Sequence, residues 1–264
     1  MRGILDNMTA LITGASSGIG LELARVFAEH RHDIVLVARG EARLQALAAE
    51  LQKKGVHAHV IVADLSAPGA VKAVVDRVRD LALEIDVLVN NAGYGVYGPF
   101  LDTSLDAELS MIQVNIVALT ELAKRLLPAM VARKRGKILN VASTAAFLPG
   151  PLMAVYYATK AYVLSFSEAI ANELEGTGVT VTALCPGPTA SGFQAAASLE
   201  ESRLVAGKTL PTSREVAEAG YDALMRGTRV YVPGLSNKLT VQLPRLFPRA
   251  VITKVVRYVQ DRRH

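Results

Sequence analysis

Short, nearly continuous apolar runs alternate with longer stretches of helical periodicity along most of this chain. Runs of that length and composition are typical of strands that are buried on both faces. The stretches between them place apolar residues on one side of a helix. Predicted strands lie at 9–13, 34–38, 58–62, 87–89, 137–141, 179–184 and 229–232, and predicted helices lie at 21–29, 41–54, 69–82, 105–132 and 155–175.

Strands and helices in alternation predict an α/β fold with a parallel sheet covered by helices on both faces. There is no internal repeat, low-complexity segment or Gly/Ser/Pro-rich linker, so we expect one domain over residues 1–264. Residues 189–212 are rich in Ala, Ser and Gly, and we expect them to form a lid over a site. Thr212 and Glu215 then form a predicted capping box that opens a helix to about Arg226.

Length and composition exclude several protein classes. The chain has 264 residues, of which 51% are hydrophobic, which indicates a well-buried globular protein rather than a disordered one. No apolar run reaches the length of a transmembrane helix, and the N-terminus does not resemble a signal peptide. Cys185 is the single cysteine, so no intrachain disulfide can form. That fits a reducing compartment, and we expect a cytoplasmic location.

The net charge of +5 is concentrated in a basic tail at about 235–264. This tail has seven Lys or Arg residues and one carboxylate, a net +6, so the remaining residues carry a net −1. The body of the protein therefore does not indicate nucleic-acid binding. A helical apolar stripe in the tail could pack on the protein itself, join a subunit interface or rest on an anionic membrane. We expect the tail to be dispensable for cofactor binding. The stripe consists of Ile252, Val255, Val256 and Val259.

A glycine-rich turn lies between the first predicted strand and the first predicted helix. Glycines at such a junction let the backbone approach a pyrophosphate, whose charge the helix N-terminus favours. The alternative is a plain glycine-rich turn. The predicted cofactor-binding residues here are Gly14, Ser16, Ser17, Gly18, Ile19 and Gly20.

The end of the second predicted strand bears on the choice of cofactor. NAD-binding proteins place an acid there to hold the ribose 2′-hydroxyl. This chain has Arg39 instead, which suits the 2′-phosphate of NADP. We therefore expect NADP(H) to be preferred over NAD(H), although Arg39 could also be a solvated residue at a helix start.

Tyr156 and Lys160 lie four residues apart in a predicted helix and therefore on one face of it. A lysine ammonium at that distance should lower the pKa of the phenol, so that the tyrosine can exchange a proton with a carbonyl or alcohol oxygen. Ser143 could donate a second hydrogen bond to that oxygen. A surface Tyr and Lys on an ordinary helix is the alternative.

Taken together, these residues resemble the classical short-chain dehydrogenase/reductase family over nearly the whole chain. The resemblance implies a single-domain Rossmann-type doubly wound parallel sheet of about seven strands. It also implies a catalytic tetrad, in which Asn115 holds a water on a proton path and Lys160 binds the nicotinamide ribose. The tetrad is Asn115, Ser143, Tyr156 and Lys160, and further cofactor contacts are implied for Asp64, Leu65, Asn91, Ala92, Gly93, Pro186, Gly187 and Thr189.

The function expected is an NADPH-dependent oxidoreductase that reduces a ketone or aldehyde reversibly. Alternatives are a 3-oxoacyl-thioester reductase and a non-catalytic dinucleotide-sensing regulator. The five histidines show no metal-ligand pattern, and we expect metal-free catalysis in a homodimer or homotetramer. Apolar residues flanking the motifs suggest an apolar substrate pocket, and they are Tyr94, Phe100, Phe147, Leu148, Met153 and Phe193.

Overall fold

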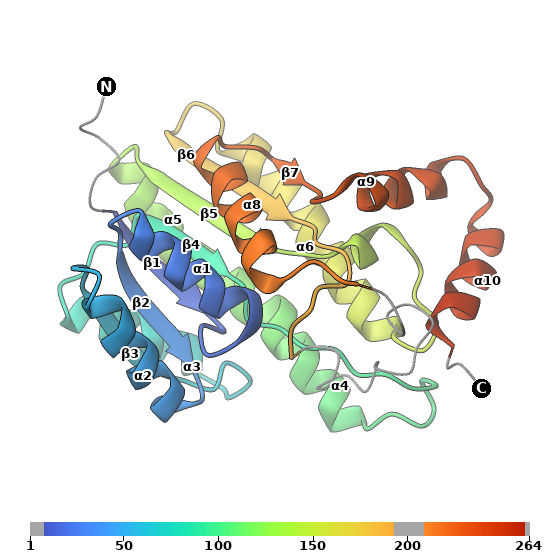
Figure 1. Cartoon of the computed structure of the whole chain (residues 1–264), viewed down its shortest axis with the longest axis horizontal. Coiled ribbons are helices and arrows are strands. Elements are labelled where there is room, and N and C mark those ends of the chain that lie inside the picture. Colours follow the sequence, from blue (N-terminus) through green and yellow to red (C-terminus); the bar gives the residue numbers. More distant parts are fainter. Residues whose placement is uncertain (1–7, 193–208, 262–264) are drawn as a thin grey trace.

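The computed structural model describes residues 8–192 and 209–261. Its centre is a sheet of seven parallel strands in the order β3-β2-β1-β4-β5-β6-β7 (Figure 1). This is the doubly wound Rossmann-type sheet that the sequence predicts, and three strands have the predicted bounds. The strands are β1 (Thr9–Thr13), β2 (Asp33–Ala38), β3 (Ala58–Val62), β4 (Val87–Asn90), β5 (Gly136–Val141), β6 (Val179–Leu184) and β7 (Val230–Tyr231).

Helices cover both faces of the sheet, because its central strands are apolar on both sides. Helices α1 (Gly18–Glu29), α2 (Glu41–Gln52) and α8 (Ser213–Met225) pack on one face. The other face is covered by α3 (Ala70–Asp80), α5 (Leu119–Ala132) and α6 (Ala154–Glu173). The predicted capping box at the start of α8 is present.

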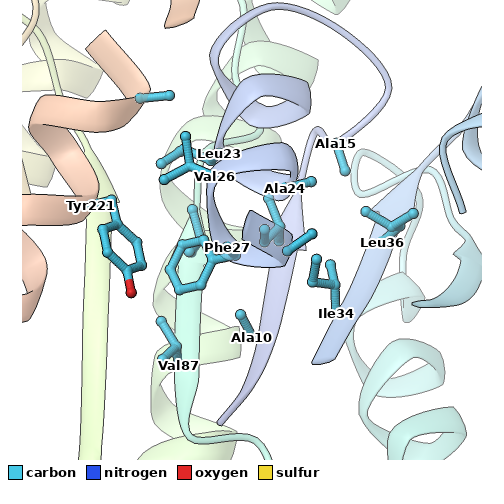
Figure 2. Close-up of a cluster of buried hydrophobic side chains, with 14 of the residues drawn as sticks. Ala10, Ala15, Leu23, Ala24, Val26, Phe27, Ile34, Leu36, Val87 and Tyr221 are labelled. Atoms are coloured by element: carbon cyan, nitrogen blue, oxygen red, sulfur yellow. The ribbon is translucent and has the colours of Figure 1, made fainter. Parts of the chain in front are cut away.

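Figure 2 shows the core on the first of these faces. Phe27 of α1 is fully buried, and its ring meets the ring of Tyr221 of α8 edge to face, with centroids 5.0 Å apart. The Tyr221 hydroxyl lies 2.8 Å from Nε2 of buried His32, so its polar end is also satisfied. This packing fixes α1, whose N-terminus faces the candidate site. The surrounding side chains in the figure include Ala10, Ala15, Leu23, Ala24, Val26, Ile34, Leu36 and Val87.

The single helix predicted at 105–132 is interrupted. Helix α4 (Leu105–Ile112) continues into a π-helical turn at Gln113–Ala118 and then into α5. Such turns occur mostly as local bulges and are frequent at functional sites. Asn115 lies in this turn and is 1% exposed.

The basic tail folds as two helices at one end of the molecule (Figure 1). Helix α9 (Leu235–Gln242) is followed by a short 3₁₀ turn (Leu243–Arg245) and by α10 (Arg249–Gln260). Within the described ranges, no helix is both long and apolar enough to cross a membrane.

The predicted lid lies partly outside the described residues, which exclude 193–208. Its two described ends meet in a parallel bridge between Ala190 and Thr212. Phe193, which was expected in the substrate pocket, also lies outside the described part.

Candidate active site

The topology of the sheet creates a crevice beside β1. The chain runs from β1 outward to β2 and β3, and then crosses over to β4 on the other side of β1. In doubly wound sheets, ligands bind at the carboxyl ends of the strands where the order reverses. A cavity of about 770 Å³ lies at this edge. All the predicted site residues except Gly20 and Asn115 line it.

The glycine-rich turn has the geometry expected for a phosphate-binding loop. Gly14 and Gly18 have positive φ angles of 67° and 56°, which side chains other than glycine rarely adopt. Ser17 precedes α1 but its side chain makes no capping hydrogen bond. The first N–H groups of α1 therefore have no side-chain cap and face the cavity, as anion binding at a helix N-terminus requires.

Gly20 contributes by close packing rather than by lining the cavity. A Cβ at this position would lie 2.3 Å from Nδ2 of Asn91 and 2.4 Å from the carbonyl oxygen of Gly14. The Asn91 side chain in turn donates to the carbonyl oxygen of Thr13 over 2.9 Å, and the Thr13 hydroxyl accepts from the backbone N–H groups of Asn91 and Ala92. These hydrogen bonds therefore connect the carboxyl end of β1 to the carboxyl end of β4, next to the glycine-rich turn.

Two arginines lie at the end of the cavity formed by β2 and β3. Arg39 is exposed. Hydrogen bonds from the side chain and backbone of Ser66 hold the pKa of Asp64 below its usual value, and the charge of Arg39 adds a smaller contribution. Arg43 also lines the cavity, and its guanidinium folds back so that a Cβ on Gly40 would lie 3.2 Å from its Nε. Sequence reasoning missed Arg43, which lies in the first turn of α2.

The proposed catalytic side chains converge at the other end of the cavity. Tyr156 and Lys160 come from α6, and Ser143 follows β5. Lys160 Nζ donates to the carbonyl oxygen of Val141 over 2.8 Å and lies 5.8 Å from the centroid of the Tyr156 ring. Tyr156 and Ser143 share a side-chain hydrogen bond. The alternative of a surface tyrosine and lysine is therefore wrong, because both side chains are buried.

The expected lowering of the Tyr156 pKa by Lys160 is wrong for this structure. Burial of the phenol raises its pKa above the ordinary value of 10, and the hydrogen bond with Ser143 only partly opposes this rise. Burial also lowers the pKa of Lys160 to about 8. The reason is that both groups share an apolar setting in which desolvation disfavours either charged form. Tyr156 is therefore held protonated at neutral pH.

Asn115 lies behind the cavity wall and connects two elements. Its Oδ1 accepts from the N–H of Tyr94, while Nδ2 donates to the carbonyl oxygen of Tyr94 and to Oγ1 of Thr159, both over 3.0 Å. The amide thus joins the loop after β4 to the catalytic helix α6. Both of its N–H groups have protein acceptors, and its role in holding a water stays a prediction.

The basic tail forms part of the cavity wall, which sequence reasoning missed. Ser236, Asn237 and Thr240 of α9 line the cavity together with Gln260 of α10. A Cβ on Gly187 would lie only 2.3 Å from Oδ1 of Asn237. That the tail is dispensable for cofactor binding stays a prediction, and these contacts are a reason to test it.

Gln260 ties the end of α10 to the catalytic helix. Its Nε2 donates to the hydroxyl of Tyr157 over 2.5 Å, and its backbone carbonyl accepts from the hydroxyl of Tyr97. Its Oε1 is buried and has no hydrogen-bond partner. An amide that lines the cavity with one polar atom unsatisfied is a candidate contact for a polar group of a substrate.

The predicted apolar pocket is confirmed in part. Tyr94, Leu148 and Met153 line the cavity. Phe147 instead packs into a separate core cluster, and Phe100 is 66% exposed. Buried Cys185 is a core residue, as expected. Among the described residues, no group of three or more metal-ligating side chains is present.

Comparison with known proteins identifies the family. Residues 8–202 match the family described as short chain dehydrogenase. The ketoacyl reductase HetN of Nostoc sp. is 33% identical over 242 residues, covering 92% of this chain and 83% of that protein. The chain spans 62% to 83% of the length of the first two curated relatives it matches.

Solved structures agree with this assignment. A short-chain dehydrogenase from Sphingobium yanoikuyae in complex with NADPH is 35% identical, with a TM-score of 0.80 over 90% of this chain and 94% of that one. A short chain dehydrogenase/reductase from Burkholderia phymatum in complex with NAD is 25% identical, with a TM-score of 0.83 over 92% and 94%. The chain is therefore an oxidoreductase of the short-chain dehydrogenase/reductase family.

Proposed function

We propose that the protein is an NADPH-dependent reductase of ketones or aldehydes with largely apolar substituents, and that the reaction is reversible. The observation that carries this proposal is the convergence of Tyr156, Ser143 and Lys160 at one end of a cavity whose other end carries Arg39 and Arg43. A reduced nicotinamide supplies a hydride to a carbonyl carbon when it is bound. The remaining requirements fall on side chains of this chain.

The proton for the reaction comes from Tyr156. As the carbonyl carbon gains a hydride, its oxygen gains the phenolic proton, so the product is an alcohol and the tyrosine is left as phenolate. The raised pKa keeps this proton in place until negative charge develops on the substrate oxygen. Ser143, whose hydroxyl donates to the carbonyl oxygen of Pro186 over 3.4 Å, would instead donate a second hydrogen bond to the same substrate oxygen. The ammonium of Lys160 then stabilises the phenolate, which regains a proton from solvent.

The residues of the cavity fit a dinucleotide. The uncapped N-terminus of α1 and the positive-φ glycines would hold the pyrophosphate, and Asp64 with Leu65 would lie beside the adenine. Two guanidinium groups, those of Arg39 and Arg43, would hold a 2′-phosphate. β2 ends in Ala38 and is followed by Arg39, with no carboxylate to accept from a ribose 2′-hydroxyl.

A 3-oxoacyl thioester is the second candidate substrate, and the relative HetN is named as a ketoacyl reductase. It requires the same proton transfer but a long acyl chain. The third hypothesis, a dinucleotide-sensing regulator without turnover, gives no reason for a buried Tyr156 that is hydrogen-bonded to Ser143.

We also propose a cytoplasmic homodimer or homotetramer. Exposed apolar side chains gather on α4 to α6, which makes that surface a candidate for self-association. They are Leu105, Leu109, Val117 and Tyr162.

The test is a panel of carbonyl compounds scored by NADPH oxidation. It should include bulky aromatic ketones, steroid ketones, short polar aldehydes and a 3-oxoacyl thioester. The proposal expects turnover of apolar ketones or aldehydes, and expects the same compounds to be poor substrates with NADH. Turnover of the thioester alone would favour the second candidate. Tight NADPH binding without turnover of any compound would favour the regulator.

A further inference from the structure

Helix α9 borders the cavity but is mostly exposed. Ser236, Asn237 and Thr240 line the cavity, and Val241 is the one buried residue of the helix. Leu235 and Leu239 point outward and are 79% and 69% exposed. A surface helix normally turns its apolar side chains toward the core, so an outward apolar face indicates a partner outside the chain.

The outward apolar surface continues through α10. Buried Val256 and Gln260 hold one side of α10 against the body, while Val251, Val255 and Tyr258 follow one another at helical spacing on the exposed side. Of the fifteen large apolar side chains that are exposed in the described residues, eight lie in this segment. We call this surface the tail face, and its apolar members are Leu235, Leu239, Leu243, Leu246, Phe247, Val251, Val255 and Tyr258.

The charge of the tail face has one sign. Between residues 235 and 260 the chain carries five cations and no carboxylate, and all five are exposed. Long basic side chains beside an apolar stripe can keep their charged ends at lipid headgroups while the stripe enters the acyl boundary. The cations are Lys238, Arg245, Arg249, Lys254 and Arg257.

We propose that the tail face docks on the surface of an anionic phospholipid bilayer. The two helices contain only 8 and 12 residues, so they would lie in the interface rather than span the membrane. A second copy of the chain fits this face less well. A two-fold interface pairs a patch with the same patch of a second copy, and here it would bring five cations of one copy toward five of the other, with Asp261 as the single acid of the tail.

Docking in this way would place α9 between the bilayer and the cavity. One side of the helix would contact lipid and the other, through Asn237 and Thr240, forms the cavity wall. The proposal does not depend on the reaction that the cavity catalyses.

The test is vesicle flotation of the full-length protein. One set of vesicles contains phosphatidylcholine alone, and the other an equimolar mixture with phosphatidylglycerol. We expect binding to the mixed vesicles that weakens as salt is added. Lys238→Gln combined with Arg245→Gln should lower the partition coefficient by about fivefold per cation, or on the order of 30-fold together. Leu239→Glu combined with Leu246→Glu should abolish binding.

Matched controls separate the tail face from general surface effects. Lys53→Gln with Lys124→Gln removes two exposed cations elsewhere, and Val62→Glu changes an exposed apolar residue on β3. These variants should bind as the parent does. The thermal midpoint of every variant shows whether it is folded.

Two results would overturn the proposal. The first is equal partitioning of the folded parent and the folded tail variants. The second combines two observations: the parent does not bind the vesicles, and sedimentation velocity shows that Leu239→Glu with Leu246→Glu dissociates an oligomer. That result would assign the tail face to contacts with a second copy of the chain.

Discussion

The ammonium of Lys160 donates a hydrogen bond to the carbonyl oxygen of Val141 over 2.8 Å. Val141 is the last residue of β5, and Ser143 follows two residues later. The bond therefore fixes the catalytic helix α6 against the strand end that carries the serine. It also holds a charged nitrogen in a setting where burial lowers its pKa to about 8.

The first prediction is that stability depends on pH through Lys160. The native pKa of about 8 lies below the ordinary lysine pKa of 10.5, so between these values the unfolded chain binds more protons than the native one. Stability from this group must therefore rise with pH over that window. Relative to Lys160→Met, the parent should gain up to ~1.4 kcal/mol of unfolding free energy per pH unit.

Urea unfolding of both proteins at pH 7, 8, 9 and 10 measures this difference. Subtracting the variant from the parent removes the titration of other groups, including Tyr156, whose raised pKa acts in the opposite direction above about pH 10. A difference that stays constant over the series would show that Lys160 is not desolvated.

The second prediction concerns cofactor choice. Arg39→Asp should weaken NADPH binding by about 10- to 100-fold, the loss expected for a hydrogen bond to a charged group, and should spare or improve NADH binding. Arg43→Ala should weaken NADPH binding in the same direction. Dissociation constants from fluorescence titration give the comparison.

Arg77→Asp is the matched control, because Arg77 is exposed on α3 and does not line the cavity. Equal affinity of the parent for NADPH and NADH would be inconsistent with the proposed 2′-phosphate site.

The third prediction concerns the contact between the cofactor segment and the tail. A Cβ at Gly187 would collide with Asn237, so Gly187→Ala should displace α9 and weaken NADPH binding. Asn237→Ala removes the colliding atoms and also loses a hydrogen bond to the carbonyl oxygen of Pro233. If the contact is direct, the double variant should bind NADPH more tightly than the sum of the two single losses in binding free energy predicts. The difference, the coupling energy between the two positions, should be about 0.5–3 kcal/mol. Additive losses would mean that the two residues do not interact.

The sequence was sufficient for the sheet and for the motifs that line the cavity. β1, β3 and β6 have the predicted bounds because buried parallel strands are apolar throughout, and short motifs follow directly where the strands end. Gly14 and Gly18 were identifiable for the same local reason, since their role is set by backbone geometry.

Features that depend on distant packing were not predictable. The π-helical turn at Gln113–Ala118 is not distinguishable from an α-helix by apolar periodicity. Ser236, Asn237 and Thr240 of α9 line a cavity built from segments that are distant in the sequence, so the pattern of residues 235–242 alone does not reveal this role. The direction of the Tyr156 pKa shift was wrong because helical spacing places Lys160 nearby but says nothing about burial.

The structure also changes how Tyr157 can be used as a control. Tyr157 is adjacent to Tyr156 in the sequence, and it also lines the cavity and accepts a hydrogen bond from Gln260. Tyr157→Phe removes the hydroxyl that accepts from Gln260, so we expect a moderate loss of activity through the position of α10 rather than a loss of the proton donor.

The most direct test of the account is the rate of carbonyl reduction by Tyr156→Phe, measured with NADPH and the best substrate of the panel. The change removes one hydroxyl and keeps the ring, so folding and the dissociation constant for NADPH should be preserved. We predict that kcat falls by ~10²–10⁴, the usual contribution of general acid catalysis. If Tyr156→Phe kept the turnover of the parent while Tyr157→Phe abolished it, Tyr156 would not be the proton donor.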